Sequence, residues 1–355
     1  MAKSKQKTPS AAQRRDKQRQ QRQQRLAGSQ NNRTQAAQAQ ARGRGPAQRQ
    51  SSRRQWLWTG GIVALIAVII VALIVISRLQ QSPGSASVPT LASSQVFNAV
   101  TKVDPNVLAS VGKGGVQNPL KAVNGSPPIL KGPTGKPEFL YMGAEYCPYC
   151  AAERWAVVVA LSRFGTFSKL YQTTSSSTDS YPSTPTFTFY SALYKGPVYT
   201  SSYIDFVPVE TLGNVQDASG NYPTLQTPTA AQQNLLSTYD AAPYTSQAGS
   251  IPFIDFGNRY VLIGASYNAQ DLASLQWQDI ANDLAGSNSA VSKDILGTAN
   301  YLTAGICMMT QQQPGSVCST PVIQSIEQSL GKAVGPGGPQ IAVSGHLEAV
   351  MRRQD

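Results

Sequence analysis

Residues 56–76, WLWTGGIVALIAVIIVALIVI, contain no charged side chain. A helix rises about 1.5 Å per residue, so a helix of this length crosses a hydrocarbon layer about 30 Å thick. Trp56 and Trp58 stand at one end of the run, where aromatic side chains favour the membrane interface. A cleaved signal peptide is the alternative, but its n-region would be far longer than usual and no clear small-residue cleavage site follows. We therefore expect an uncleaved, single transmembrane helix.

The positive charge of the chain is concentrated before this run. Residues 1–55 hold 15 of the 30 Lys and Arg residues and one of the 18 acids, Asp16, for a net charge of +14. The rest of the chain holds the other 15 basic and 17 acidic residues, for a net charge of −2. The first segment has almost no large apolar side chains to offset its ordering entropy, so we expect a disordered basic tail. Basic flanks stay on the cytoplasmic side, which predicts a cytoplasmic N-terminus and an extracytoplasmic C-terminal domain at the cell membrane.

A basic tail can bind nucleic acid or anionic lipid, because neutralising phosphate groups is favourable. We favour a charged flank of the membrane span over nucleic-acid binding, and we expect contact with the lipid bilayer through 56–76. Pro, Ser and Gly residues over 77–93 predict a linker. A folded domain is expected over 94–330, and residues 331–355, whose first part is rich in Gly and Pro, predict a flexible C-terminal tail.

Helices and strands are expected to alternate in the folded domain, from apolar periodicity and turn residues. Asp104 followed by Pro105 is typical of a helix start, and Gly257-Asn258 is typical of a tight hairpin turn. A polar, turn-rich stretch over 211–228 contributes to an insertion expected near 175–228. The expected helices cover 94–103, 104–112, 151–165, 229–240, 271–286 and 290–309. The expected strands cover 138–144, 169–177, 186–194, 197–210 and a hairpin over 251–267. This order predicts an α/β fold.

Two of the four cysteines form the motif Cys147-Pro148-Tyr149-Cys150, between a predicted strand and a predicted helix. Spacing alone leaves three interpretations: a redox pair, half of a metal site, or a structural disulfide. A thiol at a helix start lies near unpaired N–H groups and the positive end of the helix dipole, which favours the reactive thiolate. Pro148 suits the first turn of a helix because its missing N–H would have no partner there. We therefore expect Cys147 to be the nucleophile and Cys150 the resolving thiol.

The metal and structural interpretations are weaker. A structural zinc site needs four ligands, and the other cysteines, Cys307 and Cys318, do not form a second knuckle. The single histidine, His346, lies in the predicted C-terminal tail. A disulfide between Cys147 and Cys150 closes so short a loop that it removes little entropy from the unfolded chain. We expect no metal and no cofactor.

The segment Ala144-Glu145-Tyr146-Cys147-Pro148-Tyr149-Cys150 resembles the active-site segment of the thioredoxin superfamily. SIPFIDFGNRYVLIGASY, starting at Ser250, is similar to the hairpin that follows a cis-proline in that superfamily. The resemblance implies a thioredoxin-like fold with insertions, with Cys147 and Cys150 catalytic. It also implies that Ile251, Pro252, Pro148 and Tyr149 contact the substrate. Over about 90–325, including LTAGICMMTQQQPGSVC, the chain resembles an uncharacterised family of membrane-anchored thioredoxin-like proteins of bacteria and archaea, a domain of unknown function.

The chain departs from the thioredoxin pattern at one position. Thioredoxins carry a buried acid six residues before the first cysteine, where this chain has Tyr141. Glu138 and Glu145 lie nearby at other offsets, and Glu145 is expected to be a solvated surface carboxylate rather than a proton relay. The proton acceptor for Cys150 is therefore not assigned from the sequence.

Cys307 and Cys318 flank a turn-like connection. In an oxidising compartment they are expected to form a structural disulfide. An exchange relay with the pair Cys147 and Cys150, or two free thiols, are the alternatives.

Two functions follow from these features. The first is a membrane-tethered extracytoplasmic thiol–disulfide oxidoreductase that acts on protein thiols and disulfides, with an unidentified membrane redox partner. Oxidase or isomerase activity is slightly favoured, because a reductase would need electrons carried through the membrane. The alternative is a non-enzymatic thioredoxin-like binding or scaffold module. Its contacts would come from the aromatic residues of the expected insertion and its flank, Tyr181, Phe187, Phe189, Tyr190, Tyr194, Tyr199 and Tyr203.

Overall fold

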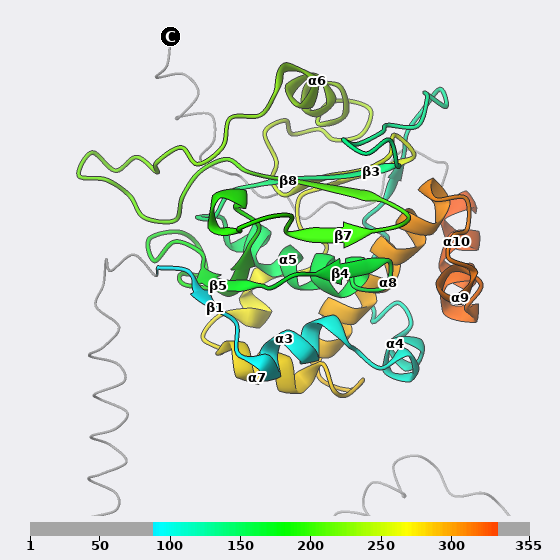
Figure 1. Cartoon of the computed structure of the whole chain (residues 1–355), viewed down its shortest axis with the longest axis horizontal. Coiled ribbons are helices and arrows are strands. Elements are labelled where there is room, and N and C mark those ends of the chain that lie inside the picture. Colours follow the sequence, from blue (N-terminus) through cyan, green and yellow to red (C-terminus); the bar gives the residue numbers. More distant parts are fainter. Residues whose placement is uncertain (1–87, 333–355) are drawn as a thin grey trace, which may run out of the picture. The chain divides into compact units, whose positions relative to one another are not determined.

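The computed structural model describes residues 88–332. The predicted tail over 1–55 and the predicted membrane span over 56–76 lie outside these residues, as does the chain after residue 332. Within 88–332, no helix combines the length and the apolar character needed to cross a bilayer. The described part is a mixed α/β domain built around a central mixed sheet (Figure 1).

The central sheet has five strands in the order β2–β10–β9–β3–β8. Strand β3, the fourth in this order, pairs in parallel with β8 and antiparallel with β9, and β9 and β10 form an antiparallel hairpin. All six residues of β3 are buried, as expected for a strand that is covered on both faces. The strands are β2 (Lys121–Ala122), β3 (Glu138–Gly143), β8 (Asp205–Glu210), β9 (Phe253–Phe256) and β10 (Tyr260–Ile263).

Alternate side chains of β3 point to opposite faces of the sheet and join two different parts of the core. Phe139 and Tyr141 belong to the larger cluster, which also contains the apolar residues of α5 (Pro148–Leu161) and α8 (Ala290–Met309). Leu140 and Met142 belong to a smaller cluster with side chains of α6 (Ala230–Tyr239). The sheet therefore lies between α5 and α8 on one face and α6 on the other, as Figure 1 shows.

Helix α5 begins at the cysteine motif and crosses the centre of the domain. Its residues are almost all buried, because it packs against the sheet, α8 and β6. A helix that is covered on all sides carries apolar residues around its whole circumference. The close approach of α8 to the sheet depends on Gly305, where an added Cβ would lie 2.9 Å from the ring of Phe256.

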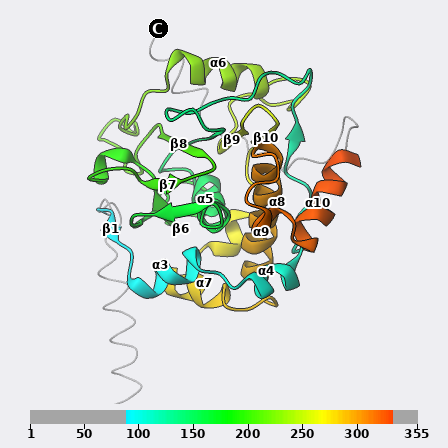
Figure 2. The same ribbon diagram turned by 45° about the vertical axis from the view of Figure 1, so that its right-hand side comes forward.

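The remaining elements surround this core. Helices α9 and α10 lie beside α8, while α3, α4 and α7 lie together at the far end (Figure 2). The range 77–93, expected to be a linker, contains β1, which pairs with β5. The range 175–228, expected to hold an insertion, contains β6, β7 and β8. The bounds are β1 (Thr90–Leu91), α3 (Ser94–Thr101), α4 (Pro105–Val111), β4 (Gly165–Phe167), β5 (Tyr171–Thr174), β6 (Pro185–Thr188), η1 (Ser191–Leu193), β7 (Tyr199–Ser201), η2 (Ala269–Leu272), α7 (Trp277–Asp283), α9 (Gly315–Cys318) and α10 (Pro321–Lys332).

Local sequence signals account for several element ends. Asp104 caps α4 by accepting a hydrogen bond from the amide of Asn106, and Gly257 and Asn258 have φ of 62° and 59° in the β9–β10 turn. The helix predicted over 271–286 is wrong in its first part. Ser274 has a φ of 68°, in the left-handed region, which separates η2 from α7.

Asp255 provides a test of how burial couples to stability. It lies on β9, its Oδ1 accepts a hydrogen bond of 2.6 Å from the amide of Asn258, and its Oδ2 is buried without a hydrogen-bond partner among the described residues. Burial raises the pKa of Asp255 to about 7. The unfolded chain ionises this group near pH 4, so its contribution to stability is complete below that pH and is lost as the pH rises to about 7.

We therefore predict that Asp255→Asn makes the free energy of unfolding less dependent on pH. Between pH 4 and 7 the wild type loses stability relative to this variant by up to about 1.4 kcal/mol per pH unit. Urea unfolding of the full chain in detergent, followed by tryptophan fluorescence, measures the difference. A difference that stays constant over this pH range would contradict the prediction.

Candidate active site

Cys147 and Cys150 lie at the junction between β3 and α5. Cys147 is the N-cap residue of α5, and its sulfur accepts a hydrogen bond of 3.3 Å from the amide of Cys150. Pro148 follows as the first helical residue, where a missing N–H costs nothing. Both cysteines are free thiols, with side chains that are 4% and 0% exposed, respectively. The pair therefore combines an amide-stabilised sulfur with a second, fully buried one.

The hairpin β9–β10 meets this junction from far along the chain. The sulfur of Cys147 lies 3.9 Å from the carbonyl oxygen of Ile251. The Ile251–Pro252 peptide bond is cis, and the carbonyl of Pro252 accepts a hydrogen bond from the amide of Gly264. Ile251 and Tyr149 pack against the cysteines, and the ring of Tyr149 also makes an edge-to-face contact with Tyr181. The residues that the sequence predicts as substrate contacts are thus neighbours of the cysteine pair.

A buried ion pair lies close to the cysteines. Arg154 of α5 and Glu210 at the end of β8 are both 0% exposed and are joined by two hydrogen bonds, of 2.9 Å from Nε and 2.6 Å from Nη2. Nη2 also donates to the carbonyl oxygen of Ala144, in the turn before the cysteines. The guanidinium group therefore connects the helix, the parallel strand and the loop that carries the pair.

Glu145 lies in the same region, and its predicted exposure is wrong. Glu145 is 4% exposed, its carboxyl group has Glu210, Arg154 and Thr188 as neighbours, and its backbone amide donates to the carbonyl of Leu212. Neither carboxyl oxygen has a hydrogen bond of normal geometry among the described residues. Burial and the negative charge of Glu210 raise the pKa of Glu145 to about 8, against the lowering effects of Arg154 and Thr188. Glu145 is therefore protonated at neutral pH and poised to titrate just above it.

Tyr141 occupies the position at which thioredoxins carry a buried acid. Its hydroxyl is buried without a hydrogen-bond partner in the described part of the chain, and Arg154 lies 5.7 Å from the centre of its ring. Burial holds the pKa of Tyr141 well above its ordinary value, so the phenol stays neutral. Burial and the contact with Cys147 raise the pKa of Cys150 well above that of a free thiol, whereas Arg154 lowers it. Cys150 therefore needs a proton acceptor before it can attack.

Three side chains of the site are absent from the sequence-based prediction: Arg154 and Glu210 of the ion pair, and Tyr222. Tyr222 stacks on Tyr146, with ring centres 4.4 Å apart and planes inclined by 8°. One signal in the sequence points to Arg154, because charged residues are rare in a helix as apolar as 151–161. Nothing local points to Glu210 or Tyr222, which reach the site only through the fold.

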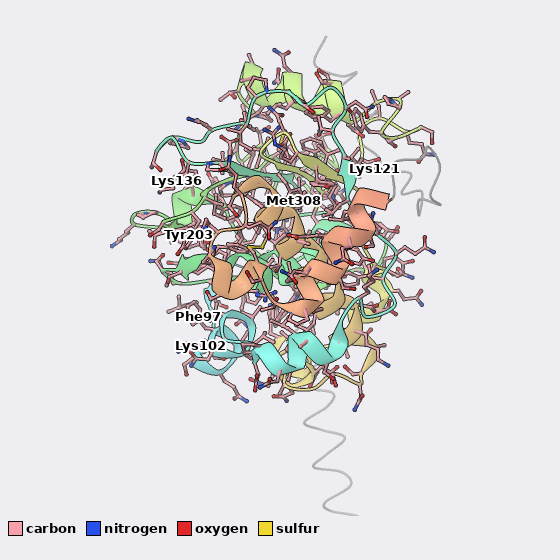
Figure 3. The ribbon with its side chains drawn as sticks, turned by 90° about the vertical axis from the view of Figure 1, so that its right-hand side faces the viewer. Phe97, Lys102, Lys121, Lys136, Tyr203 and Met308 are labelled. Carbon is pink, nitrogen blue, oxygen red and sulfur yellow. A yellow bond between two sulfur atoms is a disulfide. The ribbon has the colours of Figure 1, made fainter. Side chains whose placement is uncertain are left out.

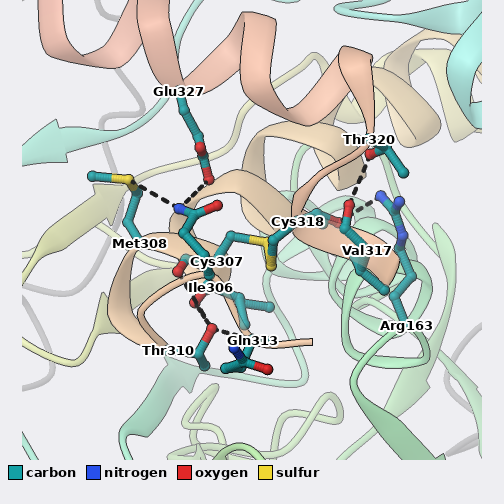
Figure 4. Close-up of a disulfide and its surroundings, with 12 residues drawn as sticks. Arg163, Ile306, Cys307, Met308, Thr310, Gln313, Val317, Cys318, Thr320 and Glu327 are labelled. Atoms are coloured by element: carbon teal, nitrogen blue, oxygen red, sulfur yellow. Dashed lines mark hydrogen bonds between the residues drawn. A yellow bond between two sulfur atoms is a disulfide. The ribbon is translucent and has the colours of Figure 1, made fainter. Parts of the chain in front are cut away.

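Cys307 and Cys318 form a disulfide away from this site. The sulfurs are 2.00 Å apart, and the bond joins the end of α8 to α9 (Figure 4). Met308, beside it on α8, is one of three large apolar side chains that are exposed in the described residues, and it is labelled in Figure 3. Gln312 links Met308 to Glu327 of α10 through its side-chain amide.

Within 88–332, no group of three or more His, Cys, Asp or Glu side chains is arranged to hold a metal ion. His346 lies outside the described residues.

Comparisons with known proteins place the site in a family. The family model described as "Domain of unknown function (DUF929)" matches residues 131–308, which include the cysteine motif, the ion pair and the hairpin. Comparison with curated proteins finds no match. Comparison with solved structures finds none either.

Gly143 offers a test of how tightly the site is packed. A Cβ at this position would lie 2.5 Å from the hydroxyl oxygen of Tyr141. Cβ atoms in folded proteins essentially never come within 3.0 Å of such a neighbouring atom. We predict that Gly143→Ala lowers the free energy of unfolding by about 1–3 kcal/mol. Combining it with Tyr141→Phe, which removes the hydroxyl, should recover part of this loss.

The matched control is Gly286→Ala, since an added Cβ there has only a carbonyl oxygen 4.0 Å away. Urea unfolding of the three variants and the wild type measures the differences. Equal stability of the Gly143→Ala and Gly286→Ala variants would show that an added Cβ at position 143 does not compete for space with Tyr141.

Proposed function

The chain belongs to the family described as Domain of unknown function (DUF929), which assigns no activity, and we propose that it is a thiol–disulfide oxidoreductase with Cys147 and Cys150 as its redox pair. The observation that carries the proposal is the setting of Cys147. Its sulfur caps a helix, accepts the amide of Cys150 and faces the carbonyl of Ile251. A sulfur in this position is ready to exchange with a second thiol three residues away.

The arrangement of the central sheet supports a thioredoxin-like fold for this domain. Strands in the order β8–β3–β9–β10, with β3 and β8 parallel and the others antiparallel, agree with a thioredoxin-like core. So do α5 and α8 on one face and α6 on the other. In this interpretation Pro148, Tyr149, Ile251 and Pro252 surround the substrate sulfur.

The proposed exchange takes place in two steps, in which atoms and electrons balance. The Cys147 thiolate attacks one sulfur of a substrate disulfide, forms a mixed disulfide and releases the other substrate sulfur as a thiolate, which takes a proton. Cys150 then loses its proton and attacks the sulfur of Cys147, so the mixed disulfide breaks and the second substrate sulfur leaves. Two electrons pass from the pair to the substrate. The same steps in reverse oxidise a substrate dithiol.

Glu145 is the best candidate for the proton acceptor of Cys150. Its carboxyl group and Cys150 share Arg154 as a neighbour, and both carboxyl oxygens are buried without a hydrogen bond of normal geometry among the described residues. With a pKa of about 8, the carboxyl can take a proton from a thiol and return it near neutral pH.

We predict that Glu145→Gln slows the release of the mixed disulfide by about 100-fold at pH 8. In the wild type this rate should rise through a pH near 8, where Glu145 becomes a base, and the variant should lack that rise. Single-turnover exchange with a peptide disulfide between pH 6 and 9 measures both. Glu327→Gln, a half-buried acid on α10, is the matched control and should retain the wild-type profile.

The proposed location follows from the sequence. The apolar run over 56–76 would tether the domain to the membrane, and the basic residues before it would keep the N-terminus in the cytoplasm. Substrates would then be protein thiols or disulfides outside the cytoplasm, and the pair would exchange electrons with a membrane partner. Oxidation or isomerisation fits this location better than reduction, which needs an electron supply across the membrane.

Trapping tests the proposed function directly. Cys150→Ser should leave substrate proteins attached to Cys147 through a bond that dithiothreitol cleaves, because the resolving thiol is missing. The experiment uses the full chain in its own membranes, with the double variant Cys147→Ser/Cys150→Ser as control. If Cys150→Ser traps nothing, and the wild-type pair does not equilibrate with glutathione buffers, the protein is no oxidoreductase.

One observation favours the alternative, a non-enzymatic binding module. Cys147 is only 4% exposed, which leaves its sulfur little contact with a protein substrate in this conformation. The aromatic residues expected to make binding contacts do not support it, because Phe187 and Phe189 are fully buried in the core. The trapping experiment separates the two functions.

A further inference from the structure

A short hairpin-like segment packs on the buried cluster that contains the cysteine pair. Its base is a bridge between Leu212 and Thr224 and a hydrogen bond of 2.8 Å from the amide of Gly213 to the carbonyl of Pro223. We call residues 213–223 the flap. Leu212 and Tyr222, at its two ends, pack on the cluster that contains Cys147 and Cys150.

The flap folds on itself. Asp217 and Asn221 are joined by a backbone hydrogen bond of 2.8 Å, and the carboxylate of Asp217 accepts the amides of Ser219 and Asn221. Every residue over 216–221 is exposed. The flap can therefore move as a unit about its base without losing these internal bonds.

Side chains of the flap hold it against the segment 173–178. Tyr222 donates a hydrogen bond of 2.9 Å from its hydroxyl to Ser176, and Thr178 donates one of 3.2 Å to Gln216. The side-chain amide of Asn214 donates to the carbonyl oxygen of Thr174. Side-chain bonds of this kind are each worth about 1 kcal/mol, so the contacts that close the flap are individually weak.

Tyr222 covers the face of Tyr146, whose side chain is 7% exposed and precedes Cys147 in the chain. When the flap opens, this ring face and the sulfur of Cys147 become exposed together. The uncovered surface is apolar, since it consists of Tyr146, Tyr149, Leu212 and Ile251 around the two cysteines. It offers stacking to an aromatic side chain.

We propose that the flap gates Cys147, and that its substrate is a polypeptide with an aromatic side chain next to its cysteine, which replaces Tyr222 on the ring of Tyr146. This inference rests on the proposed function for its chemistry, because the substrate cysteine is the one that exchanges with Cys147. Aromatic stacking contributes about 0.5–1.5 kcal/mol. At about 1.4 kcal/mol per tenfold, the preference for an aromatic neighbour is about 2- to 12-fold.

Two measurements on the full chain test the proposal. The limiting rate of Cys147 alkylation by iodoacetamide at high pH, where the thiol is ionised, reports access to the sulfur. It should be at least about 5-fold faster in Tyr222→Ala, which loses about 1 kcal/mol or more of closing contacts. Tyr222→Phe keeps the ring and loses only the hydrogen bonds of the hydroxyl with Ser176 and Thr178, so its rate should lie between those of the wild type and Tyr222→Ala. Tyr203→Ala, a half-buried tyrosine outside the flap, should react like the wild type.

The second measurement compares two peptide disulfides that differ only in Tyr or Ala beside the cysteine. The wild type should exchange faster with the Tyr peptide, and Tyr146→Leu should lose this preference while it keeps an apolar side chain at the site. Equal alkylation of Tyr222→Ala and the wild type overturns the gate, and equal exchange with both peptides overturns the substrate assignment. If alkylation accelerates but neither peptide exchanges, the gate stands, whereas the substrate assignment and the proposed function both fail.

Discussion

The ion pair between Arg154 and Glu210 connects the parts of the domain on which the site depends. Arg154 belongs to the helix that follows the cysteines, and Glu210 ends the strand that pairs in parallel with β3. Both charges are removed from water, so losing either partner would cost about 3–5 kcal/mol and leave a buried charge. The third contact of the guanidinium, to the carbonyl of Ala144, fixes the turn just before Cys147. Helix, strand and turn are therefore held in one geometry by one side chain.

The same pair governs the charge around Cys150. Arg154 favours the anionic forms of Cys150, Glu145 and Tyr141, whereas burial opposes all three. Only one negative charge, on Glu210, balances the guanidinium directly. At neutral pH Glu145 is protonated, because its pKa is about 8, so a second negative charge does not develop beside Glu210. Burial raises the pKa of Cys150 well above that of a free thiol, so this thiol holds its proton more tightly than the carboxyl of Glu145 does.

Much of the fold follows from local patterns, whereas the chemistry around the cysteines follows from distant pairings. The strand over 138–143, the helix after the cysteines and the hairpin at Gly257-Asn258 carry strong signals of apolar residues and turns. Glu210 meets Arg154 over a separation of 56 residues, through a parallel pairing that no local pattern specifies. The prediction for Glu145 fails because carboxylates are usually solvated, whereas the fold brings residues distant in sequence, Glu210 and Thr188, next to this one.

The burial of Cys147 conflicts with the access that thiol exchange requires, and opening of the flap is our explanation for how both can hold. A dithiol used in exchange needs its first sulfur within reach of the substrate, yet Cys147 is 4% exposed. Closing contacts worth about 1–3 kcal/mol leave the flap open in about one molecule in six to one in 150. Because few molecules are open, reaction with small thiols is slow, since a small thiol makes no stacking contact that would favour the open state. A polypeptide that stacks on Tyr146 recovers the lost contact and is slowed less. In the proposed function, protection from small oxidants and selection of the substrate would therefore both depend on the two stacked tyrosine rings.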